Sequence, residues 1–274
     1  MHALMGHVRA AADRYGMIEE GDRIAVGVSG GKDSLYLLYA LAMMRRYYPK
    51  RYTVIALTAD PCFGGAETDY GAVEALCREW DVEYRIRRTN LGKIIFEDRK
   101  EENPCSLCAR MRRGILHDMA KDAGCGKIAL GHHFDDVIET VLMSMLYGGE
   151  MKTMMPKVHS AHFAGMELIR PLYRVREQAV IGWARYNGLS FLRCACRLTE
   201  GTATGQLDSK RQEMKELIRA LEHRSPSVGA NIFHSFHNVN LGTLVGYRGD
   251  GVPHPFTEEY ARPGSPYWLS GEDG

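Results

Sequence analysis

Short apolar runs alternate with longer segments of helical periodicity along most of the chain. A helix is predicted over His2–Tyr15. The apolar runs have the length and composition of buried strands and cover Arg23–Val28, Tyr52–Ala59 and Lys127–Gly131, and a further strand is predicted over Asp81–Arg88. The segments after each run have helical length and cover Leu35–Tyr47, Ala66–Trp80, Met111–Ala123 and Asp135–Tyr147. Alternation of this kind predicts an α/β fold with an open parallel sheet and helices on both faces.

Beyond Arg170 the pattern becomes helical, with segments predicted over Arg176–Asn187, Ser209–His223 and Val228–Val239. From Thr243 onward, Gly, Pro and polar residues show no periodicity, so this tail is expected to be loosely ordered. The predicted organisation is an N-terminal helix (1–20), a catalytic α/β domain (21–200), a part made of C-terminal helices (201–242) and the tail (243–274).

Composition narrows the protein class. The chain has 274 residues, 25% of them charged, and a formal net charge of +1, which is usual for a globular protein and does not by itself indicate a nucleic-acid partner. No apolar run reaches membrane-spanning length, and the first segment lacks the apolar middle of a signal peptide. We therefore expect a cytoplasmic protein without a membrane partner.

A glycine-rich turn joins the first predicted strand to the next helix. Its residues are Ser29, Gly30, Gly31, Lys32, Asp33 and Ser34. Amides at a helix N-terminus bind anions, and glycines let the backbone approach phosphate oxygens closely. The spacing is neither that of a Walker A loop nor that of a dinucleotide fingerprint. Phosphate binding is favoured over a plain turn with a capping serine.

The segment SGGKDS, directly after a buried strand, resembles the PP-loop of the ATP pyrophosphatase superfamily. Members of that superfamily cleave ATP between its α and β phosphates. The resemblance implies that the six residues bind ATP and that Asp33 is a ligand of Mg²⁺, a cation that prefers carboxylate oxygens.

Four of the seven cysteines form two close pairs, Cys105/Cys108 and Cys194/Cys196. An odd number of cysteines in a reducing compartment argues against a disulfide framework, and close pairs favour a metal or redox site. All four could hold zinc, or three could hold an iron–sulfur cluster with one iron open to an external ligand.

A second turn, GHHFDD, follows the fourth predicted strand. Ligands of open parallel sheets bind outside the carboxyl ends of the strands, so this turn can face the same cleft as the glycine loop. Its residues Gly131 and His132 are candidates for nucleotide contact, with His133 as an alternative to His132. Asp136, and Asp60 at the end of the second strand, are candidates for Mg²⁺ binding or proton transfer. A capped helix start is the alternative for this turn.

Four ordered motifs, CSLCARMRRGIL, KIALGHHFDD, MLYGGEMKTMMPK and IRPLYRVRE, resemble the tRNA 2-thiocytidine synthetase (TtcA-type) family over Gly21–Cys196. The resemblance implies that ATP adenylates the C2 oxygen of a tRNA pyrimidine, most simply a cytidine of the anticodon loop. Sulfur then replaces the activated oxygen through a [4Fe–4S] cluster. It implies Cys105 and Cys108 as ligands, and Cys194 in preference to Cys196 as the third.

The implied partners are tRNA, a sulfur donor (a cysteine desulfurase or free sulfide) and, by family precedent, a second copy of the chain. Three basic clusters could contact RNA phosphates, and the one beside the cysteines contains Arg110, Arg112 and Arg113. A solvated helix face is the alternative for any single cluster.

Other functions were weighed against this one. Lysidine synthetases share the PP-loop but need no cysteine cluster, and 2-thiouridine-forming relatives usually carry additional CxxC pairs at both ends, which this chain lacks. A PP-loop enzyme acting on a small molecule, and a nucleotide-binding module with a structural Cys₄ zinc site, remain as alternatives.

Overall fold

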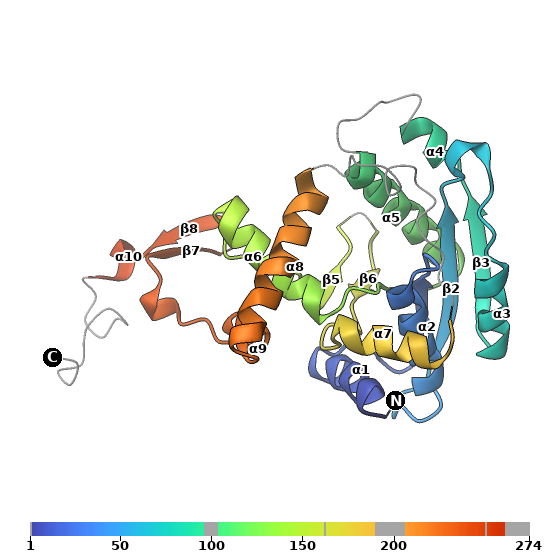
Figure 1. The fold of residues 1–274 in the computed structure, drawn as a ribbon, viewed down its shortest axis with the longest axis horizontal. Coiled ribbons are helices and arrows are strands. Elements are labelled where there is room, and N and C mark those ends of the chain that lie inside the picture. Colours follow the sequence, from blue (N-terminus) through green and yellow to red (C-terminus); the bar gives the residue numbers. More distant parts are fainter. Residues whose placement is uncertain (1, 96–103, 162, 190–205, 250, 261–274) are drawn as a thin grey trace. The chain divides into compact units, whose positions relative to one another are not determined.

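The computed structural model describes residues 2–95, 104–161, 163–189, 206–249 and 251–260, and it divides into two compact units, Met1–Gly229 and Ala230–Gly274. The first unit contains the predicted sheet (Figure 1). Sequence patterning placed a boundary at 242/243, whereas the compact units meet inside the segment 201–242.

A six-stranded sheet forms the centre of the first unit, in the order β3-β2-β1-β4-β6-β5. The strands are β1 (Asp22–Gly27), β2 (Tyr52–Asp60), β3 (Glu83–Arg88), β4 (Lys127–Ala129), β5 (Lys157–His159) and β6 (Glu167–Ile169). All neighbours are parallel except β5 and β6. The predicted fold class is confirmed, with its four strands in place. The short β5 and β6 were missed because three residues carry no measurable periodicity.

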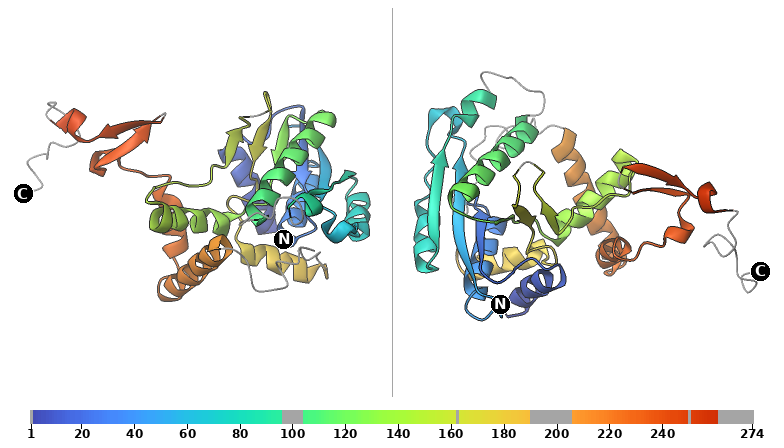
Figure 2. Two further views of the ribbon diagram at one scale, coloured as in Figure 1. Left: turned by 90° about the horizontal axis from the view of Figure 1, so that it is seen from above. Right: turned by 180° about the vertical axis from the view of Figure 1, so that it is seen from behind.

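Helices cover both faces of this sheet because successive strand residues point to opposite sides. Ile24 and Val26 of β1 pack into a core with α1 (His2–Arg14), α2 (Lys32–Met44), α3 (Gly71–Glu79) and α7 (Glu177–Tyr186). Ala25, between them, packs into a second core with Met119 and Ala120 of α5 (Pro104–Asp122). Figure 2 shows α1, α2 and α7 grouped together in both of its views.

The remaining helices of the first unit are the short α4 (Leu91–Lys93), α6 (Phe134–Gly148) and α8 (Gln206–Arg224), together with a 3₁₀ turn η1 (Phe63–Gly65). Helix α5 begins at Pro104, well before the predicted start at Met111, so the Cys105/Cys108 pair lies in its first turn. Helix α8 packs against α6. This contact brings charged residues from late in the chain to the edge of the predicted cleft.

The second unit contains regular structure in a region predicted to be without it. Helix α9 (Val228–Ser235) spans the boundary and is followed by η4 (Leu241–Thr243). An antiparallel hairpin then pairs β7 (Gly246–Gly249) with β8 (Val252–Pro255), before α10 (Thr257–Tyr260). The prediction of a loosely ordered tail from Thr243 is wrong for these residues. Four-residue strands rich in Gly and Pro give too short a pattern to detect. Among the described residues, no helix is long and apolar enough to cross a membrane.

Candidate active site

The glycine loop lies between β1 and α2, as predicted. Gly30 has a φ of +82°, a backbone conformation that side-chain-bearing residues rarely adopt, so this position favours glycine. Gly31 is the N-cap of α2 and provides no capping side chain. The serines brace the loop instead: the Gly31 amide donates to Ser29 Oγ (3.3 Å), and Ser34 Oγ donates to the Gly31 carbonyl (2.9 Å). The first amides of α2 are thereby left for an anionic ligand.

Lys32 and Asp33 carry the charge of the loop. The Lys32 ammonium lies 2.8 Å from Asp33 Oδ2 and 2.9 Å from Glu177 Oε1. Burial works to lower the pKa of Lys32, but its hydrogen bonds with Asp33 and Glu177 outweigh burial and raise that pKa. Lys32 is therefore a permanent cation. The other Asp33 oxygen, Oδ1, is buried and has no hydrogen-bond partner in the structure, as expected of a ligand for a cation.

The second predicted turn packs directly on this loop. A Cβ atom at Gly131 would lie 3.1 Å from the backbone of both Asp33 and Ser34, so any side chain here would crowd the glycine loop, whereas glycine fits without a shift. The turn starts α6 with a capping box, in which the Asp136 amide donates to His133 Nδ1 and the His133 amide donates to Asp136 Oδ2. The sheet order reverses between β1 and β4, the place where open α/β sheets bind ligands.

A cavity of about 400 Å³ opens where the two turns meet. The predicted residues that line it are Ser29, Asp33, Ser34, Arg112, Arg113, Gly131, His132 and Asp136. Helix α5 contributes the opposite wall through Ala109, Arg112, Arg113 and Leu116. The lining does not include the predicted residues Gly30, Gly31, Lys32, Asp60, Cys108 and Arg110. The structure therefore brings the loop, the histidine turn and two arginines to one cleft.

His132 is the titratable ring in this cleft. Burial lowers its pKa to about 4; nearby Asp136 opposes the shift, while Arg170, Arg211 and Arg113 add to it. The ring is consequently neutral at physiological pH, with one nitrogen able to donate and the other able to accept a hydrogen bond. Its Nδ1 is buried without a partner in the structure. A neutral imidazole suits contact with a nucleotide base or hydroxyl.

A chain of ion pairs links the glycine loop and α6 to α7 and α8, and it was not predicted from the sequence. Glu177 of α7 binds Lys32 and also lies 3.4 Å from Lys215 of α8. Arg211, one turn before Lys215, lies 3.0 Å from Asp136 and 3.3 Å from Glu139. The partners lie far apart along the chain. The only local sign was an acidic residue, Glu139, inside an otherwise apolar stretch of α6.

The pKa values of two carboxyl groups in this chain of ion pairs shift in opposite directions. The carboxyl group of Glu139 is 2% exposed, and burial raises its pKa to about 7 despite the opposing charges of Lys215 and Arg211. Burial also acts to raise the pKa of Glu177, but the hydrogen bond from Lys32 and the charge of Lys215 lower it to about 2. Glu177 is therefore a fixed anion beside Lys32, whereas Glu139 titrates near neutrality.

The contacts of Asp60 differ from those expected of its predicted role. Its side chain is fully buried, and it accepts hydrogen bonds from the amides of Cys62 (3.1 Å) and Thr68 (3.0 Å) and from the Thr68 hydroxyl (3.2 Å). Both oxygens are thus engaged in holding the loop after β2. The contacts favour a structural role over the predicted Mg²⁺ or proton-transfer role, because they leave the carboxylate little capacity for a ligand.

The predicted cysteine site is described in part. Cys105 and Cys108 lie one turn apart in α5, immediately before the residues that form the cavity wall. Cys108 is half-buried and packs against a small cluster of Leu91, Ile95 and Leu107. Cys194 and Cys196 lie outside the described residues, so the identity of the third ligand stays a prediction.

Comparison with known proteins agrees with this geometry. Residues 7–195 match the family model of the PP-loop domain. The chain is 39% identical to the tRNA-cytidine(32) 2-sulfurtransferase of Geobacter metallireducens over 86% of its own length and 89% of that protein's. It is 42% identical to the enzyme of the same name from Syntrophotalea carbinolica, over 84% and 86% of the two chains.

A solved structure is also similar. The U34-tRNA thiolase NcsA from Methanococcus maripaludis, determined with its [4Fe-4S] cluster, superposes with a TM-score of 0.66 and 25% sequence identity. The match covers 85% of this chain and 76% of the thiolase.

Proposed function

The chain belongs to the PP-loop family and, within it, to the tRNA-cytidine(32) 2-sulfurtransferases, and on this premise we propose that its cleft activates and thiolates a tRNA cytidine. The protein is an ATP-dependent tRNA sulfurtransferase. The observation that carries the site assignment is the contact between Gly131 and the Asp33–Ser34 backbone, which brings the phosphate loop and the histidine turn to one cavity. Cytidine 32 of the anticodon loop is the proposed target, as in the named relatives.

The residues of the cleft fit ATP with Mg²⁺. The glycine loop presents the amides of α2, and the unpartnered Oδ1 of Asp33 provides the carboxylate oxygen that a hard cation requires. Asp33 would hold Mg²⁺, which neutralises charge on the phosphates. Lys32, restrained by Glu177, adds a permanent positive charge next to them. These groups stabilise the pyrophosphate that leaves when the α phosphate is attacked.

The first chemical step is adenylation of the base. The C2 oxygen of cytidine attacks the α phosphorus of ATP, a P–O bond to pyrophosphate breaks, and the oxygen becomes part of an AMP leaving group. His132, neutral at pH 7, can hydrogen-bond the nucleotide at this point, and Asp136 lies in the same cavity wall. Arg112 and Arg113 provide cations on the opposite wall for RNA phosphates.

The second step replaces AMP by sulfur. Cys105 and Cys108, with Cys194 as the proposed third ligand, would hold the [4Fe–4S] cluster, since thiolates are its usual ligands. When bound, the cluster supplies the sulfur that takes the place of the C2 oxygen. Cys108 fits this assignment because it directly precedes the cavity-lining Ala109 in α5. A cysteine desulfurase or free sulfide is the proposed sulfur source, and a cytoplasmic homodimer the proposed form.

The test is thiolation of tRNA by purified, anaerobically reconstituted enzyme, with nucleosides analysed by mass spectrometry. We expect 2-thiocytidine with the wild-type chain and none with Cys108→Ser, which retains ATP cleavage. Cys62→Ser is the matched control, because Cys62 belongs to neither of the two close cysteine pairs, and it should thiolate normally. A colourless protein with stoichiometric zinc, or thiolation by Cys108→Ser, would contradict the assignment.

A further inference from the structure

A second cavity, of about 430 Å³, lies among α2, α3 and α7. It is on the face of the sheet that these helices cover, opposite to α5. It shares no lining residue with the cleft at the glycine loop. Both cavities are contacted by α2: Asp33 lines the first, and Tyr39, six residues later, lines the second. At 1.5 Å per residue the two positions are about 9 Å apart along the helix axis. The second cavity is a separate site that the thiolation chemistry leaves unexplained.

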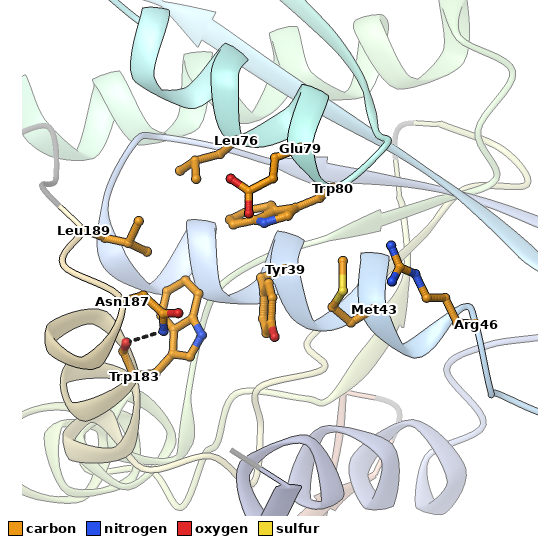
Figure 3. A pocket seen from close by; sticks show the side chains of 9 residues that line it. All are labelled: Tyr39, Met43, Arg46, Leu76, Glu79, Trp80, Trp183, Asn187 and Leu189. Atoms are coloured by element: carbon orange, nitrogen blue, oxygen red, sulfur yellow. Dashed lines mark hydrogen bonds between the residues drawn. The ribbon is translucent and has the colours of Figure 1, made fainter.

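Aromatic rings from three helical segments form its floor. Tyr39 of α2 lies 5.3 Å from the Trp80 ring, at an interplanar angle of 69°, and 5.3 Å from the Trp183 ring, at 39°. Figure 3 shows the three rings side by side, with Leu76 and Leu189 above and beside them. The two tryptophans are 5% and 6% exposed, so the protein holds them rigidly and presents only a strip of each ring. Such a surface binds a flat apolar group.

Asn187 at the edge of this floor donates a hydrogen bond to the Trp183 carbonyl oxygen (2.7 Å), but other polar groups of the lining have no such partner among the described residues. The Trp183 side chain is well over nine-tenths buried, and its indole nitrogen, on the side of the ring that faces Tyr39 (Figure 3), has no hydrogen-bond partner in the structure. At the rim, the side chains of Arg46 and Glu79 form no ion pair with any residue that the structure describes. A buried donor without an acceptor is costly, and a ligand that accepts from it recovers that cost.

These features define the chemistry of a ligand. It has a flat heterocycle to lie on the aromatic floor and a ring nitrogen or carbonyl to accept from the Trp183 indole. It has an anionic group for the Arg46 guanidinium, and an amino group can donate to Glu79. A purely aliphatic ligand leaves the indole donor unsatisfied, and a cationic ligand is repelled by Arg46. We propose that this cavity is a second nucleotide-binding site, which holds the base against Tyr39 and Trp80 and the phosphate at Arg46.

Two sources can supply such a nucleotide, namely a free mononucleotide and an unstacked nucleotide of an RNA chain. Aromatic side chains commonly bind the splayed bases of single-stranded RNA. The proposal stands apart from the thiolation site, because it rests on residues that do not line the glycine-loop cleft. The two sources are distinguished by the ligand used in the test.

The experiment uses intrinsic fluorescence, because two of the three tryptophans of the chain line this cavity. AMP, CMP, adenosine and a short single-stranded RNA are titrated separately into the full-length Asp33→Ala variant, whose primary ATP site is disabled. We expect saturable quenching by AMP or CMP if a free nucleotide is the ligand. Quenching by the RNA alone identifies an RNA nucleotide as the ligand.

Two further substitutions in the Asp33→Ala background localise the binding. Arg46→Ala should weaken binding of the quenching nucleotide or RNA about tenfold while changing adenosine binding less than about threefold, since only the phosphate contact is lost. Tyr39→Ala should weaken the binding of every ligand that quenches the fluorescence. Arg46 is exposed, so its variant should fold normally. The proposal is overturned by absence of quenching with every ligand, or by quenching that neither Arg46→Ala nor Tyr39→Ala alters.

Discussion

The ammonium nitrogen of Lys32 lies 2.9 Å from Oε1 of Glu177 and so ties the phosphate loop to the first residue of α7. The same carboxylate reaches Lys215 of α8. The loop is consequently held from two later segments of the chain as well as by its own hydrogen bonds. The position of Lys32 is set before ATP arrives, and preorganised charge is what an enzyme needs where a leaving group becomes negative.

Neutralising Glu177 should therefore impair the chemical step. We expect Glu177→Gln to lower kcat for pyrophosphate release about tenfold, which corresponds to about 1.4 kcal/mol, without raising KM for ATP. The KM should not rise because one of the two carboxylates that compete with phosphate for Lys32 is lost. Glu222→Gln is the matched control, since Glu222 pairs with Arg176 and does not contact Lys32. A raised KM with unchanged kcat would show that Glu177 acts on ATP binding instead.

Asp33 and Asp60 should give different phenotypes when changed. Asp33→Ala should abolish ATP cleavage while leaving the melting temperature close to that of the wild type, because Asp33 Oδ1 accepts no hydrogen bond in the protein and Lys32 keeps its second carboxylate partner, Glu177. Asp60→Ala should lower the free energy of unfolding by about 2 to 4 kcal/mol, because three donors lose their acceptor. Calorimetry and an ATP cleavage assay separate the two effects. An inactive Asp60→Ala variant of wild-type stability would restore the predicted catalytic role of Asp60.

The raised pKa of Glu139 predicts how the free energy of unfolding changes with pH. Its pKa is about 7 in the folded protein and 4.5 when unperturbed, so the folded state binds the extra proton between these values. This contribution to stability is fully present below pH 4.5 and is lost as the pH rises through 7. Glu139→Gln should therefore flatten the fall of the unfolding free energy with pH over this window. Urea denaturation at several pH values measures the slope, and an unchanged slope would refute the assignment.

His132 should remain neutral throughout the physiological range. Burial lowers its pKa to about 4, so its imidazole resonances should titrate with a midpoint near 4 in an NMR pH series. Unfolded histidine has the unperturbed pKa of 6.5, so this group adds stability above that pH and loses it as the pH falls through 4. A midpoint of His132 near 6.5 would show that the cleft is open to solvent.

Local signals in the sequence predicted the parallel sheet and the helices that cover it. Alternating strands and helices established the parallel sheet, and the order of β1 and β4 placed the SGGKDS and GHHFDD turns at one edge. Each turn is one continuous stretch of sequence, so its chemistry could be recognised without knowing which residues surround it in the fold. Family membership then followed from the order of four such motifs.

Other parts depended on contacts between distant segments. Arg211 and Lys215 lie in no motif, and Glu177 ends the motif IRPLYRVRE without showing which cation it contacts, because an ion pair between distant segments leaves no trace in nearby residues. Asp60 had the position of a catalytic carboxylate along the chain, and only the tertiary structure revealed the three hydrogen bonds to the following loop that favour a structural role. The β7–β8 hairpin escaped detection because its strands are shorter than a recognisable period.

The sequence by itself determined that this chain folds as a PP-loop domain and uses ATP, since backbone geometry at a glycine turn is a local property. Contacts in the folded chain set which carboxylates hold Lys32 and raise the pKa of Glu139. They also bring Tyr39, Trp80 and Trp183 together at a second cavity. The physical reason is that burial and electrostatic coupling depend on neighbours in space. Those neighbours come from segments that the chain brings together only on folding.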